Sequence, residues 1–196
     1  MKNLEIYIHI PFCVRKCEYC DFLSFPADDD AKLRYVKGLM AEMIFYGPLM
    51  KNYQVSSVYI GGGTPSSIDE QWIAALMEGV FDCFNVLPDA EISIECNPGT
   101  LSREKLLAYM DAGINRLSIG LQSANNDELK LLGRIHTFEQ FVTNYEVARN
   151  VGFKNINVDL MYGLPGQSAS QYMATVNKII RLHPDHISAY SLIVEK

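Results

Sequence analysis

Residues 155–161 (NINVDLM) form a short apolar run of the kind that favours a buried strand, and residues 163–166 (GLPG) follow it as a turn. Ser168 and Gln171 then have the spacing of a capping box that opens a helix, and Pro184 ends the helical pattern. This stretch therefore predicts one strand–turn–helix unit. The unit recurs along the chain, with candidate strands at residues 4–10, 57–60, 91–96, 116–122, 155–161 and 186–194. Four further helix starts are expected at Asp30, Ser67, Ser102 and Thr137.

Strands that alternate with crossover helices predict an α/β fold with a parallel sheet. A closed barrel of eight such units usually needs about 250 residues, and this chain has 196. Two shapes fit a chain of this length: an open doubly wound sheet and an incomplete barrel. In both shapes, ligands bind at the carboxyl ends of the strands.

Composition excludes several classes of protein. The 17 basic and 23 acidic residues give a net charge of −6, which argues against a nucleic-acid partner, since such binding needs a cationic face. The chain contains no run of 18 apolar residues for a membrane span, and its start does not resemble a secretory signal. These features predict a cytoplasmic protein, and in that reducing compartment clustered cysteines bind metal more often than they form disulfides.

The strongest local signal is the group Cys13, Cys17 and Cys20, directly after the first predicted strand. Three thiolates within eight residues can bind three irons of an iron–sulfur cluster and leave one iron open to a ligand. Zinc is a second reading, with His9 as a fourth ligand, although structural zinc sites usually use two ligand pairs. A cysteine trio that binds no metal is the third.

Several motifs beyond the cysteines strengthen the first reading. They are residues 7–13 (YIHIPFC), 61–65 (GGGTP), 94–99 (IECNPG), 114–123 (INRLSIGLQS) and 159–166 (DLMYGLPG). Together they resemble the oxygen-independent coproporphyrinogen III oxidase family of the radical S-adenosylmethionine (SAM) superfamily, over essentially the whole chain. The resemblance implies a partial (β/α)6 TIM-like barrel. We therefore expect residues 1–196 to be a radical SAM core domain, truncated before the C-terminal domain that the family normally has.

The resemblance also implies the cofactors and their ligands. Cys13, Cys17 and Cys20 would hold a [4Fe-4S] cluster whose open iron binds SAM. The SAM-binding residues implied by motif position are Tyr7, Tyr19, Gly62, Gly63, Thr64, Glu95, Gln122, Arg134, Asp159 and Ile193. Plainer readings remain open for some of them, because residues 61–63 can be a strand-ending turn and Glu95 and Asp159 can be structural.

The family contains two functions. Its oxidases make protoporphyrinogen IX by radical decarboxylation, and they carry an extra cysteine two residues after the last cluster ligand and an N-terminal extension. Here Asp21 and Phe22 follow Cys20, and the first strand begins near residue 4. Both departures favour the sister group of haem chaperones, which bind SAM and haem and transfer haem to membrane respiratory enzymes.

Two other functions are also possible for this sequence, and each function implies binding partners. An oxygen-independent coproporphyrinogen III oxidase is the second hypothesis, and an electron-transfer or zinc-binding module is a distant third, so whether the chain is an enzyme stays open. The expected partners are haem or a porphyrin(ogen), an electron donor protein and membrane respiratory haem proteins.

Overall fold

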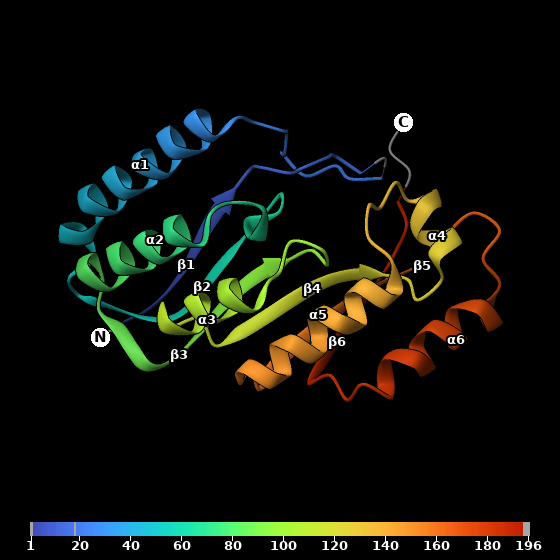
Figure 1. The fold of residues 1–196 in the computed structure, drawn as a ribbon. Helices are drawn as coiled ribbons and strands as arrows, with labels where there is room; N and C mark the ends of the chain where they lie inside the picture. The colour runs from blue at the N-terminus through green and yellow to red at the C-terminus, as the bar shows by residue number, and fades with distance from the viewer. Residues whose placement is uncertain (1, 18, 194–196) are drawn as a thin grey trace.

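The computed structural model describes residues 2–17 and 19–193, and within them the strands form one parallel sheet. The six strands are β1 (Lys2–Ile10), β2 (Tyr53–Gly62), β3 (Val86–Cys96), β4 (Arg116–Gln122), β5 (Asn155–Tyr162) and β6 (His186–Ser191). They lie side by side in chain order, and each neighbouring pair is parallel. A doubly wound sheet would reverse its strand order near the middle. The observed order, together with the curl of the sheet in Figure 1, confirms the partial barrel.

Helices cover the outer side of this curled sheet (Figure 1). They are α1 (Asp29–Tyr46), α2 (Glu70–Cys83), α3 (Arg103–Asp111), α4 (Asn126–Leu131), α5 (Phe138–Val151) and α6 (Ala169–Ile180), with short 3₁₀ turns η1 (Gly47–Met50) and η2 (Pro65–Ser67). In the part of the chain that the structure describes, none of these helices is both long and apolar enough to cross a membrane.

Three of the predicted helix caps are confirmed. Ser102 caps α3, and Thr137 and Ser168 cap α5 and α6, each with the full capping box. The caps predicted at Asp30 and Ser67 are wrong.

Aspartates at neighbouring positions take the place of the two wrong caps. Asp28 accepts a hydrogen bond from the backbone of Ala31 and caps α1 two residues earlier than expected. Ser67 lies inside η2, so Asp69 caps α2 instead. The sequence analysis did not predict α4, whose six residues are too few to show a helical period.

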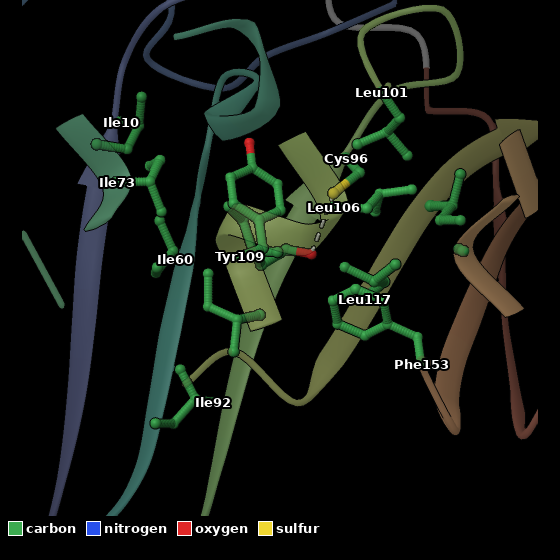
Figure 2. Packing of buried hydrophobic residues seen from close by; sticks show 14 of the residues in the cluster. Ile10, Ile60, Ile73, Ile92, Cys96, Leu101, Leu106, Tyr109, Leu117 and Phe153 are labelled. Atoms are coloured by element: carbon green, nitrogen blue, oxygen red, sulfur yellow. Dashed lines mark hydrogen bonds between the residues drawn. The ribbon is translucent and has the colours of Figure 1, made fainter. Parts of the chain in front are cut away.

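The outer face of the sheet forms the hydrophobic core. Alternate residues of the middle strands, among them Ile94, Leu117 and Val158, are fully buried beneath the helices. Figure 2 shows Leu106 and Tyr109 of α3 packed over this face. Apolar area buried between sheet and helices is the main favourable contribution to folding.

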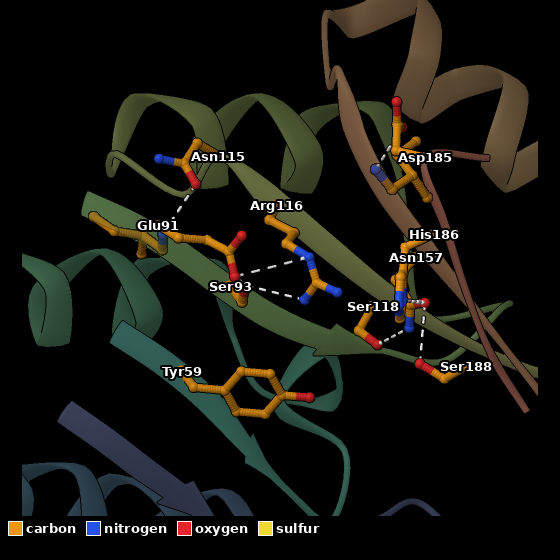
Figure 3. A network of polar contacts seen from close by, with 12 residues as sticks. Tyr59, Glu91, Ser93, Asn115, Arg116, Ser118, Asn157, Asp185, His186 and Ser188 are labelled. Atoms are coloured by element: carbon orange, nitrogen blue, oxygen red, sulfur yellow. Dashed lines mark hydrogen bonds and ion pairs between the residues drawn. The ribbon is translucent and has the colours of Figure 1, made fainter. Parts of the chain in front are cut away.

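The inner face of the same strands is polar. Ser93, Ser118 and Asn157 point away from the helices (Figure 3), where Ser93 accepts a hydrogen bond from Arg116 and Ser118 accepts one from Asn157. The strands therefore alternate between core and lumen, and are not apolar on both faces as buried parallel strands usually are. This alternation creates the polar lumen that holds the candidate site.

Candidate functional site

A cavity of about 580 Å³ lies at the carboxyl ends of the strands. Its wall combines the loop that follows β1 with the inner faces of β2 to β6. This is the end of a parallel barrel where ligands are expected, and the volume lies within the usual range for small-molecule sites.

The cysteine loop forms one side of the cavity. Phe12 and Phe25 close the loop at its base: they pair as an isolated bridge, and their rings meet edge to face at 5.8 Å. The loop carries Cys13, Cys17 and Cys20, which are all half-buried, unpaired and in contact with the cavity.

The three thiols share a wall of the cavity but do not converge on one point. Among residues 2–17 and 19–193, no three His, Cys, Asp or Glu side chains are grouped closely enough to hold a metal ion. The assignment of Cys13, Cys17 and Cys20 as cluster ligands therefore stays a prediction.

The glycine run at residues 61–63, where β2 ends, brings the backbone against the cysteine loop. The backbone N–H of Gly63 donates to the carbonyl of Ile10 at 2.8 Å. A Cβ at Gly63 would lie 2.9 Å from the Cys13 sulfur and 2.7 Å from the carbonyl oxygen of Phe12. Gly62 has φ +119°, a backbone conformation that other residues rarely adopt. The run is thus more than a turn, because only glycine permits this close approach to Cys13.

Glu95 projects into the cavity from the end of β3. Its carboxylate accepts hydrogen bonds from the Tyr59 hydroxyl at 2.8 Å and from the Gly62 backbone N–H at 3.0 Å. Burial raises the pKa of Glu95, although the two hydrogen bonds oppose that shift. A cationic or hydroxyl-bearing ligand would compensate the carboxylate for its lost hydration.

Asp159 occupies the corresponding position near the end of β5. Its carboxylate accepts hydrogen bonds from the Asn157 amide at 2.7 Å and from the Ser118 hydroxyl at 3.2 Å. Burial raises the pKa of Asp159 above its ordinary value. The cavity therefore holds two half-buried carboxylates, both supported by neutral donors from their own or adjacent strands.

Arg134 reaches the cavity from the segment after α4. One terminal nitrogen, Nη2, donates to the Asn97 side chain at 2.7 Å and to the Gly120 carbonyl at 2.6 Å. The other, Nη1, lies 3.6 Å from the Cys17 sulfur and 3.5 Å from the Tyr19 hydroxyl. The buried Nε has no hydrogen-bond partner within the described residues. Arg134 thus links the cysteine loop to β3 and β4.

Gln122 ends β4 in a strained conformation, with φ +75°, next to a shift in the β4–β5 register. Its side chain accepts a 2.6 Å hydrogen bond from the Tyr190 hydroxyl. Burial raises the pKa of Tyr190 to about 12, so this phenol remains a donor at neutral pH. Together these two residues close the β4–β6 side of the cavity.

The structure places all but one of the predicted site residues on the cavity wall. These residues are Cys13, Cys17, Tyr19, Cys20, Gly62, Gly63, Thr64, Glu95, Gln122, Arg134, Asp159 and Ile193. The exception is Tyr7, whose side chain is 58% exposed; its hydroxyl bonds to His9 Nδ1 at 2.9 Å, and its ring stacks on Tyr59. In this arrangement Tyr59, and not Tyr7, lines the cavity.

Sequence reasoning missed several polar residues of the cavity wall. Four of them are Tyr59, Asn97, Arg116 and Tyr190. Three of them lie on predicted strands, so the period of two within each strand could have assigned them to the lumen together with Glu95 and Asp159.

Comparisons with known proteins agree with this geometry. The family model described as "Radical SAM superfamily" matches residues 7–179. The "Heme chaperone HemW" of Escherichia coli (strain K12) is 39% identical over 198 residues, which cover 98% of this chain and 51% of that protein. The "Heme chaperone HemW" of Bacillus subtilis (strain 168) is 40% identical over 190 residues, which cover 96% and 50%.

A solved structure gives the same result for the fold. "Coproporphyrinogen III oxidase (HemN) from Escherichia coli" superposes with a TM-score of 0.90 and 32% identity, over 98% of this chain and 44% of that chain. The chain spans about half the length of the curated relatives it matches. Since the family model covers most of the chain and the fold is the expected partial barrel, the chain belongs to the radical SAM superfamily.

Proposed function

We propose that this chain is the radical SAM core of a haem chaperone, and that it binds a [4Fe-4S] cluster and SAM in the cavity described above. One observation carries the cofactor part of the proposal. The three free thiols of the cysteine loop share a single cavity with the half-buried carboxylates Glu95 and Asp159 and with Arg134.

The donor set suits the cluster. Cys13, Cys17 and Cys20 would hold it, since three thiolates leave one iron for a further ligand. The missing side chain at Gly63 keeps the space beside Cys13 free. When both cofactors are bound, the reduced cluster supplies the electron for reductive cleavage of SAM.

The rest of the wall suits SAM. Arg134 is held by Asn97 and Gly120 through Nη2, so Nη1, which lies beside Cys17 and Tyr19, is the nitrogen left to donate to a carboxylate. Glu95 and Asp159 can accept hydrogen bonds from an amine or from ribose hydroxyls. Tyr19 and Ile193 supply the flat and apolar surfaces that would cover an adenine and exclude water from the site.

The haem chaperone branch is favoured by the sequence after the last cysteine and by the relatives. Asp21 and Phe22 follow Cys20, so the extra cysteine of the oxidases is missing. Curated haem chaperones are 36–40% identical to almost the whole chain. We infer haem as the cargo, and membrane respiratory haem proteins and an electron donor protein as partners. Five unpaired cysteines suit a reducing cytoplasm.

An oxygen-independent coproporphyrinogen III oxidase is the second candidate. The TM-score of 0.90 with the E. coli oxidase supports it, because that structure has the same barrel. In this case the substrate would be coproporphyrinogen III, and the chain would belong to an enzyme.

The cofactor proposal is tested by electron paramagnetic resonance of the full-length protein. The protein is reconstituted anaerobically with iron and sulfide, reduced, and measured with and without SAM. We expect a [4Fe-4S] signal that changes when SAM is added. A protein that binds zinc and forms no cluster would contradict the proposal.

The two functions are separated by their products. A haem chaperone binds haem stoichiometrically and does not convert coproporphyrinogen III. Formation of protoporphyrinogen IX over many turnovers, measured by chromatography after anaerobic incubation with SAM and a reductant, would instead establish the oxidase.

A further inference from the structure

The lumen continues below the residues assigned to SAM. In the register of the sheet, Glu95 of β3 pairs with Ser118 of β4, whereas Ser93 pairs with Arg116 two residues earlier. Two residues correspond to about 7 Å along a strand. Arg116 therefore lies in a deeper layer of the barrel, and it lines the same continuous cavity as the cysteines.

Arg116 has unused hydrogen-bonding capacity in this layer. Its side chain is 15% exposed, and Nη1 donates to the Ser93 hydroxyl at 3.2 Å. Its ion pair with Glu91 spans 3.8 Å from Nε to Oε1, too far for a hydrogen bond. A guanidinium has five N–H groups, and among the described residues only Ser93 accepts a hydrogen bond from this one.

The nearby carboxylates do not satisfy Arg116. Glu95 is bonded to Tyr59 and Gly62, and Asp159 is bonded to Asn157 and Ser118. Figure 3 shows the Arg116 guanidinium extended across the inner face of the sheet, between the Ser93 and Ser118 side chains. The Nε atom of Arg134 is buried and has no hydrogen-bond partner, but no nitrogen of Arg116 is in that state. The N–H groups of Arg116 that have no partner are therefore accessible from the cavity, whose wall includes Arg116.

We propose that Arg116 is a binding residue for a carboxylate of the tetrapyrrole that the protein carries, and this inference rests on the proposed function. A partly buried guanidinium with free N–H groups matches a carboxylate, which it can bind with two parallel hydrogen bonds. Haem presents its carboxylates on flexible propionate arms, which can enter a lumen that the macrocycle itself does not fill. The Ser93 hydroxyl accepts a hydrogen bond from Nη1, and the remaining N–H groups of the guanidinium are free for the ligand.

The experiment compares two iron porphyrins that differ only in their carboxylates. The full-length protein, loaded anaerobically with cluster and SAM, is titrated with ferric protoporphyrin IX and with its dimethyl ester, and binding is followed in the Soret band. We expect the wild-type protein to bind the free acid about 10- to 100-fold more tightly than the ester, since hydrogen bonds to charged groups contribute that much. Arg116→Gln should lose this preference.

Two controls separate binding from folding and from net charge. Arg103→Gln removes the same charge from the exposed surface of α3, and it should keep the preference for the free acid. Glu91→Gln removes the ion-pair partner of Arg116 but keeps the guanidinium. If the ion pair is purely structural, Glu91→Gln and Arg116→Gln should lose the preference for the free acid equally. Our proposal predicts that only Arg116→Gln loses this preference. Arg116→Lys keeps the charge without the two-pronged geometry and should retain part of the preference.

Each other outcome has a distinct meaning. A wild-type protein that binds acid and ester equally, or an Arg116→Gln variant that still prefers the acid, overturns the inference and leaves the haem chaperone intact. A wild-type protein that binds neither porphyrin overturns the proposed function and the inference with it. If Arg116→Gln instead weakens SAM binding and keeps the preference for the acid, Arg116 binds the carboxylate of SAM, and the tetrapyrrole assignment is wrong.

Discussion

The two faces of the same sheet have opposite chemistry. On the outer face, Ile94, Leu117 and Val158 are fully buried in a continuous apolar core. On the inner face, Glu95 and Asp159 lie one residue away from Ile94 and Val158 and line a polar cavity. Because side chains alternate along a strand, a shift of one residue would exchange the two sets completely.

This contrast separates stability from function. A substitution on the outer face disturbs the packing of the core, since helix side chains are close-packed against this face. The inner face is held by hydrogen bonds between neutral donors and two carboxylates, and it leaves about 580 Å³ of space. We therefore expect outer-face variants to lower stability and inner-face variants to lower binding.

The largest effect is expected in the loop that closes the inner face. Serine at Cys13, Cys17 or Cys20 removes one of the three proposed thiolate ligands, so we expect each variant to fail to retain the cluster. The measurement is the iron content and visible absorbance after anaerobic reconstitution. Cys83→Ser is the matched control, because Cys83 lies on α2, away from the cavity wall, and should load normally. Full loading of a Cys13, Cys17 or Cys20 variant would show that the ligand assignment is wrong.

The fold was largely predictable from the sequence because its pattern is repetitive. Each strand run is followed by turn residues and a cap, and Ser102, Thr137 and Ser168 cap helices as expected. The errors at Asp30 and Ser67 arise where several aspartates and serines compete. Asp28, Asp29 and Asp30 are adjacent and equally able to cap, so only the course of the chain before α1 decides between them.

The site was predictable where the resemblance assigns a role to a residue and not where only geometry does. The cysteines, Gly63, Glu95 and Arg134 have such a role, and they line one cavity. Arg116 lies in the motif at residues 114–123, but only its place in the lumen and its unused N–H groups reveal it as a candidate binding residue. Tyr7 occurs in a motif but lies outside the cavity wall, because Tyr59 from the neighbouring strand stacks against it.

The next effect tests the outer face against the inner face of a single strand. Ile94→Ala should lower the free energy of unfolding by about 2–5 kcal/mol, because it leaves a cavity in the core. Ser93→Ala, its neighbour on the inner face, loses the hydrogen bonds that the hydroxyl makes with Arg116 and Glu91 and should cost about 1 kcal/mol. Urea denaturation under reducing conditions measures both values. Similar losses for the two variants would contradict the division between core and lumen.

A smaller effect, on the affinity for SAM, is expected when the negative charge of Asp159 in the lumen is removed. Asp159→Asn keeps the shape of the side chain and removes its negative charge, and we expect it to weaken SAM binding about 10- to 100-fold. Asp111→Asn is the control, because Asp111 lies exposed at the end of α3. Calorimetric titration of SAM into the anaerobically reconstituted protein gives the affinities. Equal affinities for the two variants would place SAM away from Asp159.

The smallest effect is expected from His136, a buried residue in the segment between α4 and α5. Burial, together with the charge of Arg134, lowers the pKa of His136 to about 4, and its Nε2–H donates to the Leu121 carbonyl at 3.3 Å. The unfolded chain, with a pKa near 6.5 at this histidine, binds more protons between pH 6.5 and pH 4. Stability must therefore fall as the pH drops through this window, and the contribution of His136 is constant above it.

His136→Gln isolates this contribution, because glutamine can donate to the same carbonyl but does not titrate. Between about pH 7 and pH 5.5, the wild-type protein should lose about 1 kcal/mol more of its free energy of unfolding than the variant does. Urea denaturation at the two pH values, on cluster-free protein, provides the comparison. Equal losses in the two proteins would show that His136 has the same pKa in the folded and unfolded states, and that burial does not lower it.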